Sequence, residues 1–387
     1  MAYWLANIKS MKIVIAPDSF KESLSAQQVA YTIQQAFIQH LPDADYYTVP
    51  MADGGEGTTK SLIDALTGDM VLLQVQDPLG EPVTAKYGLV KETAIIEIAE
   101  ASGLHLVAKE QRNPEITCSF GTGEMILDAL NRGVDKVIVG LGGSATNDGG
   151  AGMLTALGVK FLDASGKPVA RGGAGLASIT TIDSSALHPR VKEVSWLVAC
   201  DVNNPLTGDF GASAVFGPQK GATLSQLLTL DQALQHYAYK VFNHTQIGVA
   251  TIAGAGAAGG LGAAFLAFMN ATLRPGVDIV ADTLNLAEIC QNADLVITGE
   301  GRLDAQSIAG KTPVGVARIA KAAGAKQVIA IAGCLGDGYE KVYEHGIDAV
   351  FDCLNQLQPI EVILSQGAEN LRITADSLAR LIKNTKG

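Results

Sequence analysis

Short β-branched runs alternate with amphipathic helical stretches at both ends of the chain. Near the N-terminus, residues 12–16 predict a buried strand, a capping box formed by Ser25 and Gln28 opens a helix to about His40, and residues 45–50 predict a second strand. The C-terminal end repeats this rhythm, with helices predicted at 284–291, 313–323, 339–345 and 371–383 and strands at 294–298, 327–332 and 348–353. Such alternation is typical of right-handed βαβ units and predicts a parallel sheet.

The pattern changes in the middle of the chain. The sequence Asp77-Pro78-Leu79-Gly80 predicts a turn that joins 71–76 to 83–90 in an antiparallel hairpin, and a mixed, glycine-rich α/β region then continues to about Asp282. We therefore predict an α/β protein of two domains. A Rossmann-like parallel-sheet domain is built from both chain ends (11–77 plus 283–387), and a second mixed α/β domain (78–282) is inserted into it. This layout predicts a cleft between domains, where ligands commonly bind.

Composition excludes several classes of partner. The 387 residues include 28 Lys and Arg against 39 Asp and Glu, a formal charge of −11, which disfavours nucleic acid and anionic membranes. Five widely separated cysteines fit a reducing compartment better than a disulfide framework. Residues 245–273 carry no charge but contain six glycines, which favours a buried loop and helix over a membrane span. We expect a soluble, cytoplasmic protein.

Two glycine motifs invite a nucleotide-site interpretation. Residues 140–145, after a strand predicted at 136–139, and residues 254–259 both match a dinucleotide fingerprint, but 43 glycines make such matches common. Residues 305–312 lack the first glycine of a phosphate loop, and Thr312 as N-cap with Pro313 at the first helical position explains them simply. A lysine at that helix start, Lys311, still suits a phosphate.

Acidic residues recur in glycine-rich loops after predicted strands. The loops contain Asp53, Asp148, Asp201 and Glu300, each with Gly or Asn within two residues. Open α/β sheets bind ligands at the carboxyl ends of their strands. Carboxylate oxygens suit Mg²⁺, and glycine lets the backbone approach phosphates closely. Together these loops point to phosphoryl transfer, although Asp, Asn and Gly are also ordinary turn formers.

Basic residues near glycines or helix starts fit the same chemistry. They are Lys21, Lys220, Arg302 and Lys311, although each also suits a solvated surface position. The six histidines show no metal-binding spacing, and we assign them no role.

Seven strings taken in order resemble the bacterial type I glycerate kinase family over nearly the whole chain. They are APDSFKESLSA (16–26), ADGGEGT (52–58), GLGGSATNDGG (140–150), DVNNPLTG (201–208), FGPQKGA (216–222), GAGAAGGLG (254–262) and TGEGRLDAQS with GKTP (298–313). The resemblance implies ATP-dependent phosphorylation of D-glycerate with Mg²⁺, generally at the 2-hydroxyl. The sequence itself does not choose between the 2- and 3-hydroxyl, nor does it give the oligomeric state.

We assign provisional roles to residues within these strings. Ser19, Phe20, Lys21 and Arg302 are candidates for binding the substrate, because they lie in strand-end loops and Lys21 supplies a cation for a carboxylate. Asp53 or Asp201 is the candidate base, with Lys21 as a further catalytic candidate. Gly142, Gly143, Ser144 and Lys311 are expected to contact ATP, and Asp148 and Glu300 to lie near Mg²⁺.

Two other classes of function remain open at this stage. An NAD-dependent oxidoreductase of small hydroxy acids would explain the glycine fingerprint at 140–145. A non-catalytic sensor of sugar acids would also present carboxylate-binding groups, but four acidic loops would not help it to bind an anion.

Overall fold

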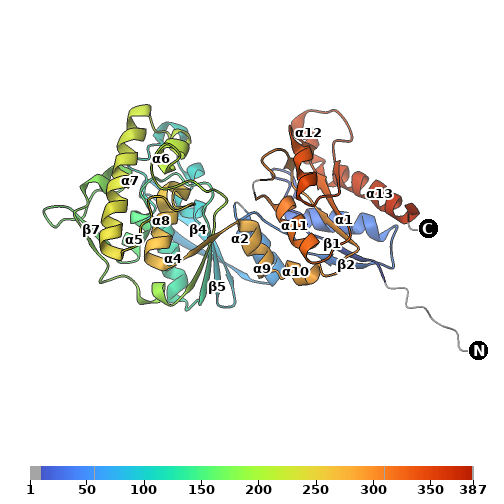
Figure 1. Cartoon of the computed structure of the whole chain (residues 1–387), viewed down its shortest axis with the longest axis horizontal. Coiled ribbons are helices and arrows are strands. Elements are labelled where there is room, and N and C mark those ends of the chain that lie inside the picture. The colour runs from blue at the N-terminus through green and yellow to red at the C-terminus, as the bar shows by residue number, and fades with distance from the viewer. Residues whose placement is uncertain (1–9, 56, 309, 386–387) are drawn as a thin grey trace, which may run out of the picture. The chain divides into compact units, whose positions relative to one another are not determined.

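The computed structural model describes residues 10–55, 57–308 and 310–385 and is of mixed α/β class (Figure 1). It divides into two compact units. The terminal unit comprises residues up to Asp53 together with Val280–Gly387, and the central unit comprises Gly54–Ile279. Glu56, part of one predicted acidic loop, lies outside the described residues.

The terminal unit contains a five-stranded sheet of order β15-β13-β11-β1-β2 in which every neighbouring pair is parallel. The predicted alternation at the chain ends is therefore confirmed. The sheet strands are β1 (Lys12–Ile15), β2 (Asp45–Thr48), β11 (Leu295–Thr298), β13 (Val328–Ala332) and β15 (Ala349–Asp352). A short parallel pair joins β12 (Arg302–Leu303) to β14 (Cys334–Leu335).

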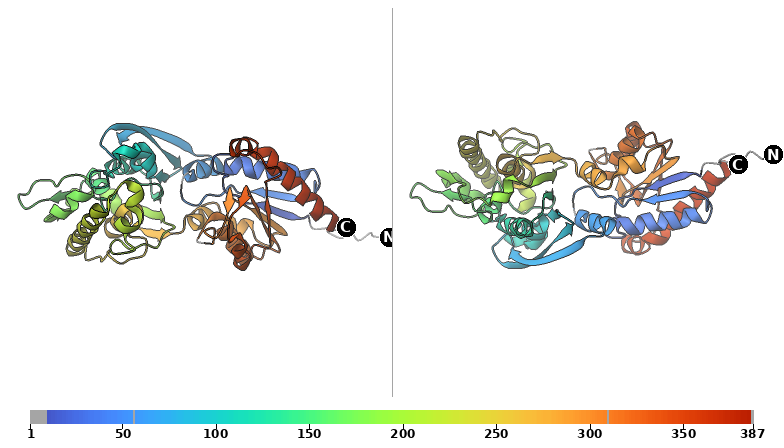
Figure 2. Two further views of the ribbon diagram at one scale, coloured as in Figure 1. Left: turned by 90° about the horizontal axis from the view of Figure 1, so that it is seen from above. Right: turned by 90° about the horizontal axis from the view of Figure 1, so that it is seen from below.

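Helices cover both faces of this sheet (Figure 2). Helices α1 (Ala26–Ile38) and α13 (Gly367–Thr385) pack against each other, and their apolar faces share a core with alternate residues of β1 and β11. Helix α11 (Thr312–Ala322) packs against β11 and β13. The remaining helical segments are α10 (Leu286–Ile289), the 3₁₀ turn η6 (Tyr339–His345) and α12 (Ile360–Ser365).

The capping box that opens α1 forms as predicted. The Ser25 hydroxyl accepts from the Gln28 amide at 3.2 Å, and the Gln28 side chain accepts from the Ser25 amide at 2.9 Å. Helix α11 begins differently from the prediction. Its N-cap is Lys311 rather than Thr312, and no side chain caps it, because the Thr312 hydroxyl donates instead to the Asp18 carboxylate.

The central unit contains a six-stranded mixed sheet of order β10-β9-β6-β5-β4-β3. Its strands are β3 (Asp69–Gln76), β4 (Pro82–Val90), β5 (Thr93–Glu97), β6 (Lys136–Gly140), β9 (Ser195–Ala199) and β10 (Thr272–Arg274), with β7 (Lys160–Leu162) and β8 (Thr181–Asp183) forming a separate antiparallel pair. Strands β5, β6, β9 and β10 pair in parallel, whereas β3, β4 and β5 pair antiparallel.

The hairpin predicted around Asp77 is confirmed, with the Gly80 amide donating to the Asp77 carbonyl at 3.0 Å. Because of this hairpin, the first boundary between the two units differs from the predicted one. We predicted that the inserted domain begins at Pro78, but β3 pairs with β4 along its whole length and α2 (Thr58–Leu66) packs on β4, so the central unit begins at Gly54.

Helices pack around the central sheet and its large core. They are α2, α3 (Ala99–Ser102), α4 (Phe120–Asn131), α5 (Ala151–Ala156), α6 (Ala212–Phe216), α7 (Leu224–Thr245) and α8 (Ala257–Met269), with 3₁₀ turns η1 (Leu104–Leu106), η2 (Lys109–Gln111), η3 (Gly173–Ser178), η4 (Pro189–Lys192) and η5 (Pro218–Lys220). Helix α9 (Gly276–Thr283) contains residues of both units. The charge-free stretch forms the buried α8, as predicted. No helix in the described part of the chain has the length and apolarity that a membrane span requires.

Candidate functional site

Three carboxylates of the terminal unit lie at the carboxyl ends of neighbouring parallel strands. Asp18 follows β1, Asp53 follows β2 and Glu300 follows β11. They are close enough to repel one another electrostatically, since both Asp53 and Glu300 raise the pKa of Asp18. We call Asp18, Asp53 and Glu300 the acidic cluster. The structure thus brings together two predicted site residues, Asp53 and Glu300, and adds Asp18.

Asp18 is the most strongly perturbed carboxyl group of the cluster. Burial and then the charge of Asp53 raise its pKa to about 7, although hydrogen bonds from Thr312 and from the Ser19 amide, at 2.6 Å, oppose the shift. Two further bonds fix this strand end, because the Asp18 amide donates to the Gly299 carbonyl at 2.8 Å and the Thr298 hydroxyl donates to the Ala16 carbonyl at 2.9 Å.

Lys311 and Ser307 surround Glu300. The Ser307 hydroxyl donates to Glu300 Oε1 at 2.6 Å, and Lys311 Nζ lies 3.4 Å from Glu300 Oε2. Burial raises the pKa of Glu300, and both neighbours act in the opposite direction. Lys311, predicted to contact ATP, is therefore placed beside a residue predicted to lie near the metal.

The candidate substrate-binding residues also belong to the terminal unit. Phe20 is buried and closes a tight turn with Leu24, which holds Lys21 out toward solvent. The backbone of Gly301 packs against this turn, and the next residue, Arg302, pairs with Asp304 at 3.3 Å on the surface. The turn and Arg302 are thus neighbours, and Phe20 anchors the turn from inside.

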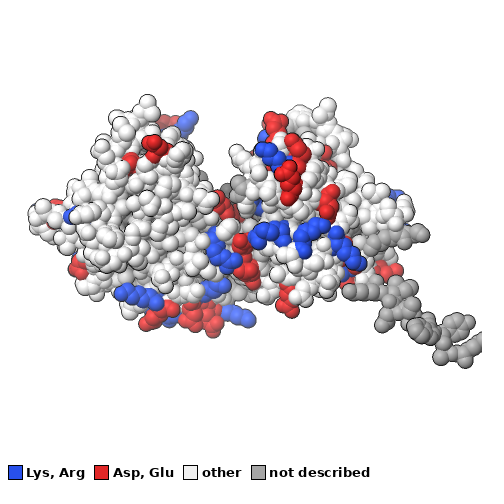
Figure 3. Space-filling view, viewed as in Figure 1, with Lys and Arg blue, Asp and Glu red and all other residues white. Residues whose placement is uncertain are grey.

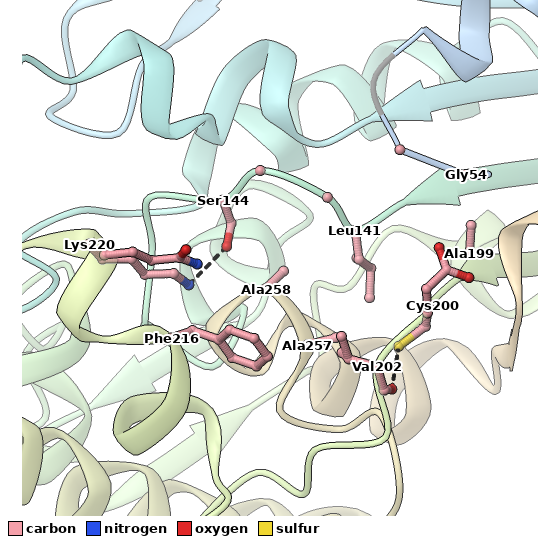
Figure 4. Close-up of a pocket in the computed structure, with 15 residues that line it drawn as sticks. Gly54, Leu141, Ser144, Ala199, Cys200, Val202, Phe216, Lys220, Ala257 and Ala258 are labelled. Atoms are coloured by element: carbon pink, nitrogen blue, oxygen red, sulfur yellow. Dashed lines mark hydrogen bonds between the residues drawn. The ribbon is translucent and has the colours of Figure 1, made fainter. Parts of the chain in front are cut away.

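The loop of Gly142, Gly143 and Ser144, which we predicted to contact ATP, lines a pocket of the central unit (Figure 4). Gly142 and Gly143 are exposed on the loop that follows β6, and neither backbone amide has a hydrogen-bond partner among the described residues. Gly143 has φ +72°, which favours glycine. Successive amides of such a loop can bind an anion.

Asp201 lies in the same pocket, just after β9, where its Oδ1 accepts from the Gly276 amide at 3.0 Å. Two residues whose side chains the sequence does not single out for this pocket, Phe216 and Gln219, also line it. Lys220 completes the polar side of the pocket, and sequence analysis noted it only as one basic residue among four.

Asp148 differs from the other acidic candidates because it is 1% exposed. Its carboxylate accepts from the amide and hydroxyl of Ser119, both at 2.8 Å, and from the amides of Gly150 and Gly152 at 3.1 and 3.2 Å. These bonds show that Asp148 organises the turn that leads into α5. Asp148 and Glu300, which we predicted to lie near Mg²⁺ or the phosphates, belong to different units.

The raised pKa of Asp18 predicts that this carboxyl group lowers the free energy of unfolding of the ligand-free protein in a pH-dependent way. A carboxyl group whose pKa is higher in the folded state destabilises that state increasingly as pH rises from about 4 to about 7. Asp18→Asn should therefore raise the free energy of unfolding more at pH 8 than at pH 5, by on the order of 1–3 kcal/mol, measured by urea unfolding.

Asp376→Asn is the matched control, because hydrogen bonds from His40 and Arg380 lower the pKa of Asp376. This variant should lose stability instead. An equal effect of Asp18→Asn at both pH values would contradict the electrostatic origin of the cost.

Comparison with known proteins identifies the family. Residues 13–383 match the model of the glycerate kinase family. A glycerate kinase of Haemophilus influenzae is 54% identical over 96% of this chain and 99% of its own length, and a glycerate 2-kinase of Escherichia coli K12 is 50% identical over 97% of each. A crystal structure from Salmonella typhimurium LT2, provisionally named glycerate kinase 2, superposes with a TM-score of 0.90 at 50% identity over 97% of this chain and 99% of its own.

These matches give no support to the oxidoreductase alternative. They agree with the α/β architecture and with the order of the seven sequence motifs. The chain belongs to the glycerate kinase family.

Proposed function

We propose that this enzyme transfers the γ-phosphoryl group of ATP to the 2-hydroxyl of D-glycerate, giving 2-phosphoglycerate and ADP. The observation that carries the proposal is the 50% identity, over 97% of each chain, to a protein named glycerate 2-kinase. The site residues support it, because acidic strand-end loops and exposed glycine amides are the groups that phosphoryl transfer requires.

The pocket of the central unit suits the phosphates of ATP. Gly142 and Gly143 offer unpartnered amides, and Ser144 and Lys220 add polar groups at the same loop. We assign a second phosphate contact to Lys311, at the start of α11, where an anion would be stabilised by both the ammonium group and the helix N-terminus.

The turn that contains Ser19, Phe20 and Lys21 suits the glycerate carboxylate. Lys21 and Arg302 both extend into solvent from adjoining segments of the terminal unit. Neither cation is committed to a buried ion pair, so both remain accessible to a small carboxylate. Phe20 serves this site by anchoring the turn.

The acidic cluster fits Mg²⁺ better than Asp148 does. Burial, and then mutual repulsion, raises the pKa of Asp18 and of Glu300, and a bound divalent cation would favour the charged form of both carboxylates. Among the described residues, no group of three or more His, Cys, Asp or Glu side chains is arranged to hold a metal unaided. Mg²⁺ usually takes one or two carboxylates from the protein and completes its shell with phosphates and water.

Bound Mg²⁺ would neutralise charge on the phosphates. We propose Glu300, with Asp18 or Asp53, as its protein ligands. Asp148, which the sequence also suggested, already directs its oxygens to four protein donors.

The function is tested by mixing the enzyme with ATP, Mg²⁺ and D-glycerate and measuring ADP release, followed by phosphorus NMR of the product. We expect ADP formation that depends on D-glycerate and a phosphorus resonance coupled to the proton at C2. A product coupled to the C3 protons would overturn the assignment of the 2-hydroxyl. ADP release that is unaffected by glycerate would overturn the substrate.

A carboxylate is expected to accept the proton of the substrate hydroxyl, and Asp53 and Asp201 are the two candidates. Replacing the base with Asn should lower kcat at least about 100-fold while leaving the fold intact. Asp53→Asn and Asp201→Asn are compared by steady-state kinetics, with circular dichroism to check folding. Near-normal turnover in both variants would exclude both assignments.

Lys311→Ala should raise the apparent KM for ATP by about tenfold, because a charge-assisted contact to a phosphate is lost. Lys321→Ala is the control, since Lys321 lies near the other end of α11 and pairs with Asp348 at 2.7 Å. An unchanged KM for ATP in Lys311→Ala would show that Lys311 pairs with Glu300 but does not contact ATP.

A further inference from the structure

Lys220 is a buried cation with no carboxylate partner among the described residues. It comes from η5, is 2% exposed and lies among the largest fully buried side chains of the described residues. Its Nζ donates to Ser144 Oγ at 2.9 Å (Figure 4). It also donates to the Thr146 carbonyl at 2.7 Å. Both acceptors are uncharged, and no ion pair forms between Lys220 and any acidic residue that the structure describes.

Burial of this ammonium group has an electrostatic cost. Burial lowers the pKa of Lys220 to about 7, and the charge of Asp148 only partly offsets it. A core position favours an apolar side chain unless the cation has a use. Lys220 lines the same pocket as the exposed amides of Gly142 and Gly143, so an anion bound to those amides would supply the missing negative charge.

The direction of the hydrogen bond between Lys220 and Ser144 determines whether the Ser144 hydroxyl can act as a donor in the pocket. In its charged form Lys220 has donors only, so Ser144 Oγ then accepts from Lys220 and its own proton is available to another acceptor. Ser144 also lines the pocket, beside Gly142 and Gly143. Lys220 therefore makes the Ser144 hydroxyl a donor at the loop where amide donors already gather.

The loop is held at its base by other bonds. The Leu104 amide donates to the Gly143 carbonyl at 2.8 Å, and the Ala145 amide donates to the Ser102 carbonyl at 2.8 Å. These bonds hold the backbone of the loop without Lys220. Lys220 itself orients the Ser144 hydroxyl, binds the Thr146 carbonyl and adds positive charge beside the pocket.

We propose that Lys220 is a positioning residue for ATP, which holds the Ser144 hydroxyl as a donor to a phosphate oxygen and supplies positive charge behind it. This inference rests on the proposed function in one respect, namely that the loop of Gly142, Gly143 and Ser144 contacts the phosphates. Lys220 acts through Ser144 and does not itself touch the reacting atoms.

A double-mutant cycle tests the proposal. Lys220→Met keeps the length of the side chain and removes the charge, and Ser144→Ala removes one oxygen. Each variant should raise KM for ATP by about tenfold and leave KM for glycerate within about twofold. The double variant should resemble the single variants, because the two residues act in series.

Lys240→Met is the matched control, since Lys240 is a partly exposed lysine of the same unit whose Nζ donates to the Thr180 carbonyl at 3.1 Å. It should leave both KM values unchanged. Multiplicative effects in the double variant, of about 100-fold, would overturn the proposal, as would a rise confined to KM for glycerate.

Calorimetric titration with a non-hydrolysable ATP analogue separates this proposal from the proposed function. Weaker binding of the analogue by Lys220→Met and Ser144→Ala supports the role of Lys220 even if the wild-type enzyme fails to phosphorylate glycerate. If Lys220→Met does not fold, Ser144→Ala alone decides, because unchanged affinity for the analogue in that variant overturns the proposal.

Discussion

Parallel pairing of β1 with β2 and β11 is the constraint on which the terminal unit depends. It places three carboxyl-terminal strand ends side by side, although β11 lies far from β1 and β2 in the chain. Asp18, Asp53 and Glu300 consequently come together, and their mutual repulsion follows from the topology rather than from any local sequence. The chain reverses its direction of travel across the sheet at β1, and ligands bind at such a switch point.

The central unit uses the same edge of a sheet in a different way. After β6 and β9 the chain presents glycine amides, a hydroxyl and a buried ammonium group together with the carboxylate of Asp201. The terminal unit thus gathers three carboxylates, whereas the central unit gathers mainly donors. On the face shown in Figure 3, acidic and basic side chains otherwise occur side by side on the surface of each unit. The uneven distribution of charge is therefore a property of the strand-end loops.

Local features were predictable from the sequence, whereas features set by distant contacts were not. The capping box of α1 and the turn at Asp77 involve neighbouring residues, and both formed as predicted. The helix expected at 339–345 is a 3₁₀ turn, enclosed by glycines 338 and 346 at positive φ. Asp18 was overlooked as a site residue although its motif was recognised, because its raised pKa arises from burial in the folded unit and then from the charges of Asp53 and Glu300. Thr312 does not cap α11 as expected, because its hydroxyl donates to the carboxylate of Asp18, 294 residues away in the chain.

The start of α11 shows what such an arrangement means for an enzyme between turnovers. A lysine occupies the N-cap, where the aligned peptide dipoles already carry partial positive charge and where no side chain accepts from the free amides. A capping Ser or Asp at that place would make a more stable resting protein. The chain instead keeps an electropositive helix end next to the carboxylates of the acidic cluster. The ligand-free protein therefore gives up folding stability at this point, and a bound ligand would restore it.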